Sequence, residues 1–290
     1  MRPVFQWNLG ARTLELGKRT LIMGIVNVTP DSFSDGGLYL DSEKATMHAL
    51  QLLDEGADIL DIGGESTRPG ARTAAVSAEE ELRRVLPVIT ALKKQRPNAL
   101  ISIDTGKATV ARAAMAAGAE IVNDVSALRW DPQMAKTVAE LKCGAVLMHM
   151  RGRPEEWRTL PAPGDIVLQV KRELREWVEA VVLAGVRRER IAVDPGFGFG
   201  KNFEQNYPLL ARFQELQALG FPLLVGTSRK SFLGRALAKD GEDAPVADRL
   251  YANLAAHTAL ILKGAHILRT HDVKPAIEAA RVADVILGAH

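Results

Sequence analysis

The chain has 290 residues, of which 47% are hydrophobic and 25% are charged, and its formal net charge is +2. This length and composition suffice for one domain with a full core. No basic run or aromatic–basic alternation indicates nucleic-acid binding, and no apolar stretch has the length of a membrane span or a signal peptide. The single cysteine, Cys143, excludes an internal disulfide. We therefore expect a cytoplasmic enzyme with neither nucleic-acid nor membrane partners.

The first predicted element is a β-hairpin. Residues 5–9 and 13–16 alternate apolar and polar side chains around Gly10-Ala-Arg12, which is typical of two strands with one buried face. We expect residues 1–20 to form a structural hairpin that closes the floor of a barrel, and residues 21–290 to form the barrel itself, all within one domain.

Eight short apolar runs follow, and each ends in a polar, charged or glycine cluster. They cover residues 21–30, 57–63, 100–104, 120–125, 144–149, 190–194, 222–228 and 266–271. Continuous Val, Ile and Leu runs are typical of strands buried on both faces, as in parallel sheets. The clusters place polar chemistry at one end of every strand.

Segments of helical length and character separate these runs. They cover residues 42–55, 78–95, 108–117, 133–142, 165–184, 204–219, 246–263 and 274–287. Five of them stop at the glycine expected just past a helix end, namely Gly56, Gly118, Gly185, Gly220 and Gly264. Strand followed by helix, eight times, predicts an α/β fold of the (β/α)8 TIM-barrel type. An open doubly wound sheet is the alternative, and it would bind its ligand mainly at one switch point.

Several common catalytic motifs are absent from the sequence. There is no Walker A loop, HExxH or CxxC motif, and the six histidines lack zinc-site spacing. The glycines of residues 194–201 resemble a dinucleotide-binding loop, but their spacing is wrong and we expect no helix before Lys201. This argues against a nicotinamide-dependent dehydrogenase.

Polar side chains at the strand ends predict a ligand site. Asp104 and Asp194 close the third and sixth predicted strands, and Asn123 lies in the fourth. A barrel brings these ends to one mouth, where carboxylates and amides can bind the edge of a flat, nitrogen-rich heterocycle. Each residue alone could instead cap a helix or be a satisfied core amide. The three together favour the ligand.

Positive charge gathers at the same predicted mouth. Arg68, Lys230, Arg269 and His271 lie at or just after the ends of the second, seventh and eighth strands, and the last two strand ends often hold phosphate in such barrels. A lone Arg or Lys is usually a solvated surface charge. Arg269, however, lies inside an apolar run, where an unpaired charge would be costly. An anionic ligand is therefore the simpler explanation.

Two glycine-bearing loops complete the predicted mouth. Residues 29–37 and 63–70 are rich in turn-forming residues, and they carry Phe33, Thr67 and Arg68. We expect these loops to act as flaps, although ordinary surface turns have the same composition.

The amino-acid sequences of these motifs resemble those of the dihydropteroate synthase family. The matching segments are residues 27–37, 63–71, 102–105, 123–124, 148–150, 194–201, 228–231, Arg269 and 271–273. They span nearly the whole chain, in the family's order. Gly106 and Thr270 depart from the usual pattern, but neither departure removes a functional side chain.

The resemblance implies a transferase of tetrahydrofolate biosynthesis. It would condense (7,8-dihydropterin-6-yl)methyl diphosphate with 4-aminobenzoate, giving 7,8-dihydropteroate and diphosphate, with sulfonamides as competitors. The resemblance also implies a homodimer.

The same resemblance implies roles for individual residues. The pterin ring would be held by Asp104, Asn123, Asp194 and Lys230, with Arg269 packing near it. The diphosphate would be surrounded by Asn27, Arg68, Arg269 and His271, with Asn27 acting through a Mg²⁺ ion. The aminobenzoate site would be shaped by Thr67, Pro69, Phe199 and Ser231 and closed by Phe33. The residues expected to be catalytic are Asp104, Asp194, Lys230 and Arg269.

This chemistry needs no strong base. Loss of diphosphate leaves a cation conjugated to the electron-rich dihydropterin, which favours an SN1-like path, and fixed cations and Mg²⁺ stabilise the leaving group. Three alternatives stay open at this point. They are a methyltetrahydrofolate:corrinoid methyltransferase on the same barrel, a non-catalytic pterin- or phosphate-binding relative, and a barrel whose polar strand ends only cap structure.

Overall fold

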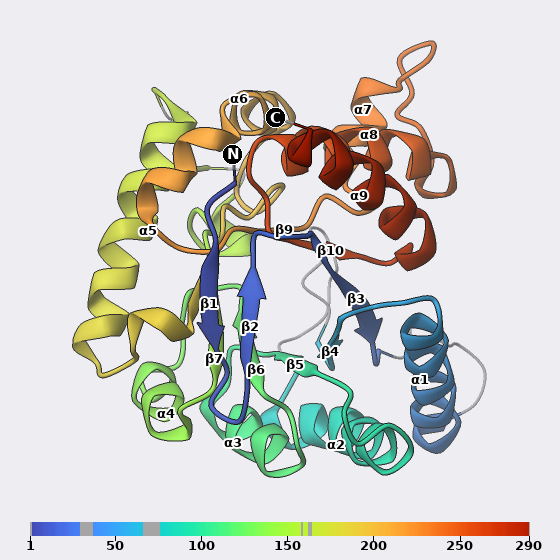
Figure 1. Ribbon diagram of the computed structural model, residues 1–290, viewed down its shortest axis with the longest axis vertical. Helices are drawn as coiled ribbons and strands as arrows, with labels where there is room; N and C mark the ends of the chain where they lie inside the picture. Colours follow the sequence, from blue (N-terminus) through green and yellow to red (C-terminus); the bar gives the residue numbers. More distant parts are fainter. Residues whose placement is uncertain (1, 30–36, 66–75, 158, 162–163, 290) are drawn as a thin grey trace.

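The structure is a computed structural model that describes residues 2–29, 37–65, 76–157, 159–161 and 164–289. Its main sheet has eight parallel strands, in the order β8-β7-β6-β5-β4-β3-β10-β9. A parallel bridge between Val193 and Leu223 joins the two outer strands. The sheet therefore closes into a barrel, with helices around its outside (Figure 1). The predicted TIM barrel is confirmed, and the open doubly wound sheet is excluded.

The barrel strands coincide with the predicted apolar runs. They are β3 (Leu21–Asn27), β4 (Ile59–Gly63), β5 (Ile101–Asp104), β6 (Ile121–Asp124), β7 (Gly144–Met148), β8 (Ile191–Asp194), β9 (Leu224–Val225) and β10 (Ile267–Thr270). All residues of β4, β6, β7 and β8 are buried. Burial on both faces explains why these runs do not alternate.

The surrounding helices follow the predicted segments closely. They are α1 (Gly37–Asp54), α2 (Ala78–Gln95), α3 (Ala108–Ala116), α4 (Met134–Leu141), α5 (Ile166–Leu183), α6 (Phe203–Ala211), α7 (Ser231–Ala236), α8 (Leu250–Leu262) and α9 (Val273–Gly288). The five glycines predicted to follow helix ends all have positive φ, between 75° and 108°. This is the conformation that glycine adopts most readily.

Two predicted helices are divided differently in the structure, and one short helix was not predicted. The segment 204–219 divides into α6 and a 3-10 helix at Phe213–Leu219, and the segment 246–263 begins with a 3-10 helix at Val246–Arg249. Such tight turns are common at helix ends, and periodicity does not distinguish them. The prediction also missed α7, because its six residues are too few to show a helical period.

The N-terminal hairpin closes the floor of the barrel, as predicted. Strands β1 (Phe5–Asn8) and β2 (Thr13–Leu16) pair antiparallel, and Figure 1 shows them across the front of the barrel. Trp7 is buried among first residues of the barrel strands, including Ile121 and Ile267, and its indole Nε1 donates to Arg190 O at 2.8 Å. A ligand site can therefore form at the opposite end of the barrel, where the carboxyl ends of the strands lie. No helix in the described ranges is both long and apolar enough to cross a membrane.

Candidate functional site

A guanidinium bound by two carboxylates lies at the carboxyl end of the barrel. Arg269 of β10 donates from Nε to Asp61 Oδ2 at 2.6 Å and from Nη2 to Asp104 Oδ2 at 2.7 Å. Asn123 of β6 donates from Nδ2 to the same Asp61 oxygen at 2.9 Å. Four strands, β4, β5, β6 and β10, therefore contribute to one hydrogen-bonded cluster, because the closed barrel brings the carboxyl halves of its strands together.

Burial controls the charge state of this cluster. Burial raises the pKa of Asp104 to about 7, although Arg269 opposes the shift and Asp61 adds to it. Burial alone would lower the pKa of Arg269, but Asp61 and Asp104 outweigh it and the pKa is raised. The arginine is therefore a fixed cation, and Asp104 can change its protonation near neutral pH.

A second charged pair lies across the mouth at the ends of β8 and β9. Lys230 donates from Nζ to Phe197 O and lies 4.4 Å from the centroid of the Phe199 ring. Burial lowers the pKa of Lys230 to about 7, against the opposing charge of Asp194. Asp194 accepts from Gly196 N at 2.7 Å, and burial raises its pKa despite the nearby Lys230. Two acids and a lysine with shifted pKa values mark this end as the candidate site.

An apolar cluster lies beside these charges. Its buried members are Val125, Met148 and Met150, and Trp130, Trp157 and Phe199 pack against them. Phe199 and Trp157 meet edge to face, with ring centroids 6.0 Å apart. The mouth thus combines flat apolar surfaces with a few oriented polar groups, which is the usual character of a small-molecule site.

Asn27 and His271 lie together at the ends of β3 and β10. Asn27 Nδ2 is 3.5 Å from His271 Nε2, and His271 Nδ1 is 3.0 Å from Ser228 Oγ. Because the amide nitrogen of Asn27 faces His271, its amide oxygen is the atom that could bind a hard cation. Mg²⁺ commonly takes one or two protein oxygens and completes its shell with substrate phosphates and water. Among the described residues no group of three or more His, Cys, Asp or Glu could hold a metal.

Four predicted site residues cannot be placed. Phe33, Thr67, Arg68 and Pro69 lie outside the described residues. Ser231 is described and is exposed at the first position of α7. The structure therefore brings together the predicted residues of the strand ends, while the two predicted flaps are not part of the described geometry.

Asp61 is a site residue that the sequence analysis missed. It is completely buried and contacts both Arg269 and Asn123. Its signal was available, because Asp61 stands inside an apolar run as Arg269 does. Two opposite charges in two buried strands of one barrel are candidates for pairing.

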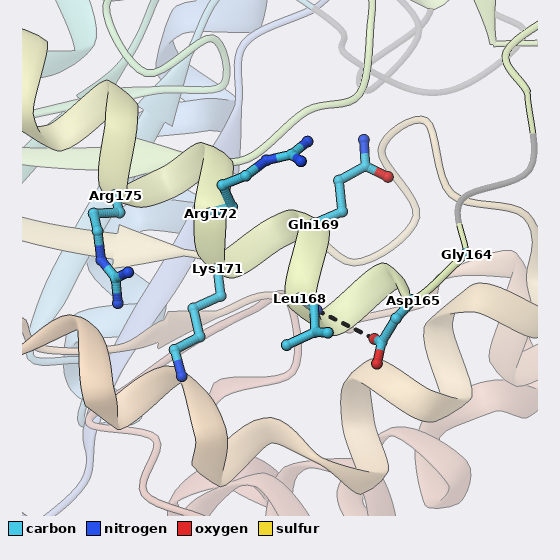
Figure 2. A pocket seen from close by; sticks show the side chains of 7 residues that line it. All are labelled: Gly164, Asp165, Leu168, Gln169, Lys171, Arg172 and Arg175. Atoms are coloured by element: carbon cyan, nitrogen blue, oxygen red, sulfur yellow. Dashed lines mark hydrogen bonds between the residues drawn. The ribbon is translucent and has the colours of Figure 1, made fainter.

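A surface groove along α5 is unrelated to this mouth. It is lined by Gly164, Asp165, Leu168, Gln169, Lys171, Arg172 and Arg175 and has a volume of about 570 Å³. Figure 2 shows its side chains spread along the outside of the helix, with Asp165 bonded to the first turn. Asp165 caps the helix, and the other side chains lie on its outer surface. None of these residues belongs to the strand-end cluster.

Comparison with known proteins agrees with this geometry. Residues 23–271 match the sequence profile of a protein family described as "Pterin binding enzyme". The dihydropteroate synthase of Escherichia coli strain K12 is 45% identical over 268 residues, covering 92% of each chain. A Xanthomonas albilineans dihydropteroate synthase solved with 4-aminobenzoic acid has a TM-score of 0.88 at 44% identity and covers 100% of both chains. A Yersinia pestis dihydropteroate synthase solved with a sulfonamide drug has a TM-score of 0.87 at 41% identity, covering 97% of this chain and 98% of that one.

Proposed function

Because this chain belongs to the pterin-binding enzyme family and has the activity of a dihydropteroate synthase, we propose that its strand-end cluster is the site of that reaction. The enzyme is a transferase that joins (7,8-dihydropterin-6-yl)methyl diphosphate to 4-aminobenzoate, producing 7,8-dihydropteroate and diphosphate. The observation that carries the assignment is the meeting of Arg269, Asp61, Asp104 and Asn123 at one barrel mouth.

The pterin ring binds between the two carboxylate groups of the mouth. Asp104, Asn123 and Asp194 present acceptors and donors for the amino and ring N–H groups of the heterocycle, and Lys230, the partner of Asp194, adds a donor. Buried hydrogen-bonding groups of this kind reject ligands that leave them unpaired. Burial raises the pKa values of Asp104 and Asp194, and hydrogen bonds from pterin N–H groups would favour the charged forms of both acids.

The diphosphate lies toward β3 and β10, where Asn27, Arg269 and His271 end their strands. Arg269 is a fixed cation beside the leaving group, and His271 is oriented by its contact with Ser228. Arg68, outside the described residues, joins this group in the proposal. A Mg²⁺ ion held by Asn27 would supply further positive charge to the departing diphosphate.

The aminobenzoate ring lies against Phe199. The ring of Phe199 lies between Trp157 and the ammonium of Lys230. Ser231, the exposed residue that follows Lys230, begins α7. Thr67, Pro69 and Phe33 complete this site in the proposal. Sulfonamides compete here because they share the flat arylamine of 4-aminobenzoate, and a relative has been solved with such a drug.

The reaction follows an SN1-like path. Departure of diphosphate leaves a carbocation conjugated to the dihydropterin, and the carboxylates of Asp104 and Asp194 stabilise it in a buried pocket. The arylamine nitrogen then forms a C–N bond to the cation, and its surplus proton passes to the departing diphosphate or to water. No strong base is required, because an arylamine is already a competent nucleophile toward such a cation.

Three further proposals concern the whole chain. We propose that residues 1–290 act as one pterin-binding domain, since the hairpin of residues 1–20 is buried against the barrel. We propose a homodimer, since apolar side chains of α8 and α9 are exposed. We also propose a cytoplasmic location, since the one cysteine, Cys143, is buried and free and fits a reducing compartment.

The test of the site is diphosphate release by the purified protein with the pterin diphosphate and Mg²⁺, with and without 4-aminobenzoate, and with the product identified by mass. We expect aminobenzoate-dependent release and a dihydropteroate mass. Lys230→Ala and Arg269→Ala should each lower kcat/KM by about 10²-fold or more. Exposed Lys239→Ala is the matched control and should leave kcat/KM unchanged. Parent-like kinetics in both mouth variants would refute the site assignment.

A further inference from the structure

The loop between β8 and α6 is built around a buried lysine that the proposed reaction does not use. Lys201 is 7% exposed. Its Nζ lies 2.8 Å from Gly196 O, 3.2 Å from Phe199 O, 3.3 Å from His149 O and 3.0 Å from His149 Nδ1. Carbonyl oxygens only accept, so Nζ donates to them. Burial lowers the pKa of Lys201 well below its usual value, and Nζ carries N–H donors for these carbonyls in either charge state. One side chain thus ties two points of the loop to the end of β7.

The imidazole of His149 links this lysine to a carboxylate on α5. His149 Nε2 lies 3.0 Å from Glu173 Oε2. Burial would raise the pKa of Glu173, but hydrogen bonds from His149 and Gln169 lower it to about 2. Burial, and then the charge of Lys201, lower the pKa of His149 to about 3. The ring is therefore neutral, with its proton on Nε2 toward Glu173 and a bare Nδ1 that accepts from Lys201.

The rest of the surroundings hold this imidazole in place. His149 is completely buried and stacks on Trp177, with ring centroids 5.1 Å apart and planes at 15°. The guanidinium of Arg129 packs 3.5 Å from the Trp177 ring centroid. A side chain restricted by a stack, a carboxylate and an ammonium has little freedom to move.

The loop itself needs such support because its backbone is intrinsically free. Gly196, Gly198 and Gly200 all have positive φ, and glycines leave a chain with more conformations than other residues do. The backbone of this loop also orients two groups of the mouth, because Phe199 is part of it and Phe197 O accepts from Lys230 Nζ. The shape of the loop therefore determines where Phe199 and Lys230 lie.

We propose that Lys201, backed by His149 and Glu173, is a positioning residue that holds the 196–199 backbone so that Phe199 forms the wall of the aminobenzoate site. Lys201 touches neither substrate in this arrangement. The inference rests on the proposed assignment of Phe199 to that site.

The test compares two lysines that bind backbone carbonyls at opposite ends of the barrel. Lys201→Met keeps the aliphatic stem and removes the ammonium. The control is Lys93→Met, because Lys93 Nζ donates to Ala99 O at 2.7 Å and Pro97 O at 3.3 Å just before β5, at the barrel floor. We expect both variants to lose thermal stability. Only Lys201→Met should raise the KM for 4-aminobenzoate, by about tenfold or more, and by more than it raises the KM for the pterin diphosphate.

Two further variants keep every outcome informative. Glu173→Gln leaves Lys201 in place and should raise the aminobenzoate KM by a smaller factor, about threefold. If Lys201→Met does not fold, the aminobenzoate KM of Glu173→Gln tests the proposed role of Lys201 instead. Phe199→Ala tests the underlying site, and an unchanged aminobenzoate KM in that variant would show that the site assignment is wrong.

The inference on Lys201 is overturned by either of two results. The first is that Phe199→Ala raises the KM for 4-aminobenzoate but Lys201→Met leaves it at the parent value. If Lys201→Met does not fold, the same comparison is made with Glu173→Gln. The other is a raised KM in Lys201→Met with none in Phe199→Ala, because the effect would then not pass through Phe199.

Discussion

At the scale of single residues, the barrel mouth places opposite charges in contact where little water reaches them. Arg269 is shared by Asp61 and Asp104, and Asp61 also accepts from Asn123. Removal of one member leaves the others buried without full compensation. These side chains therefore support the fold as well as the proposed pterin site.

Asp61→Asn tests this dual role. It keeps the shape but removes the charge that faces Arg269, so we expect the free energy of unfolding to fall by about 3 kcal/mol and the KM for the pterin diphosphate to rise. Urea unfolding and steady-state kinetics measure the two effects. Asp58→Asn is the control, since Asp58 pairs with the exposed Arg19 and the amide oxygen of Asn can still accept from Ile22 N, so the change should cost about 1 kcal/mol or less. Equal losses in the two variants would contradict the argument.

The raised pKa of Asp104 predicts a dependence of stability on pH. In the unfolded chain this acid loses its proton near 3.8, and in the folded protein it does so at about 7, because burial disfavours the charged form. Between these values the folded state binds more protons than the unfolded state, so this group makes the free energy of unfolding decrease as pH rises from about 4 to about 7 and then level off.

Asp104→Asn should remove that contribution. We expect the decrease in unfolding free energy over this pH window to be shallower in the variant than in the parent, as measured by urea unfolding at several pH values. Parallel curves would mean that Arg269 keeps Asp104 charged throughout.

At the scale of the element, the β8–α6 loop fits against the end of β7 only because it lacks side chains at critical points. A Cβ on Gly196, where φ is +64°, would lie 1.9 Å from His149 O. This contact explains the glycine at position 196. The helix that follows, α6, begins only at Phe203, as the prediction required.

Gly196→Ala should therefore displace the loop. We expect a loss of about 3 kcal/mol in stability and a raised KM for both substrates, because Asp194, Phe199 and Lys230 all contact this loop. Gly220→Ala is the matched control, since Gly220 also has positive φ, +75°, but a Cβ there meets nothing within 4 Å. It should cost about 1 kcal/mol with unchanged kinetics. If both substitutions left the kinetics unchanged, the loop would not be part of the site.

At the scale of the whole molecule, the barrel assigns its two ends to different tasks. The hairpin and Trp7 close the floor, while charged and aromatic side chains gather at the carboxyl end. The outer face formed by α8 and α9 is a third feature, because Tyr251 is 82% exposed and Val285 72% exposed. Large apolar side chains exposed on two packed helices commonly belong to an interface.

The proposed homodimer predicts an effect of charge on this face. The parent should have twice the chain mass of 31.5 kDa in light scattering after size-exclusion chromatography. Tyr251→Glu combined with Val285→Glu should shift it to the single-chain mass, because charges buried at an interface without partners are costly. Leu183→Glu, on an exposed residue at the end of α5, should leave the mass unchanged. A parent of single-chain mass would refute the proposal.

The sequence by itself determined the barrel, the hairpin and most helix ends, because these depend on local patterns. Apolar runs buried on both faces and glycines such as Gly118 and Gly264 after helices carry that information in neighbouring residues. It also indicated Asp104, Asn123, Asp194, Lys230 and Arg269 as strand-end residues. Short 3-10 turns and the six-residue α7 escaped prediction, since runs this short hold too few turns to establish a helical pattern.

Only the tertiary structure decided which of these groups meet. Asp61 and Arg269 are 208 residues apart along the chain, and Lys201 is 52 residues from His149, so no local pattern connects them. Barrel closure brings β10 beside β3, and burial then excludes the water that would otherwise separate these charges. Pairing, pKa values and the support of the Phe199 loop are therefore properties of the closed barrel rather than of any segment of the sequence.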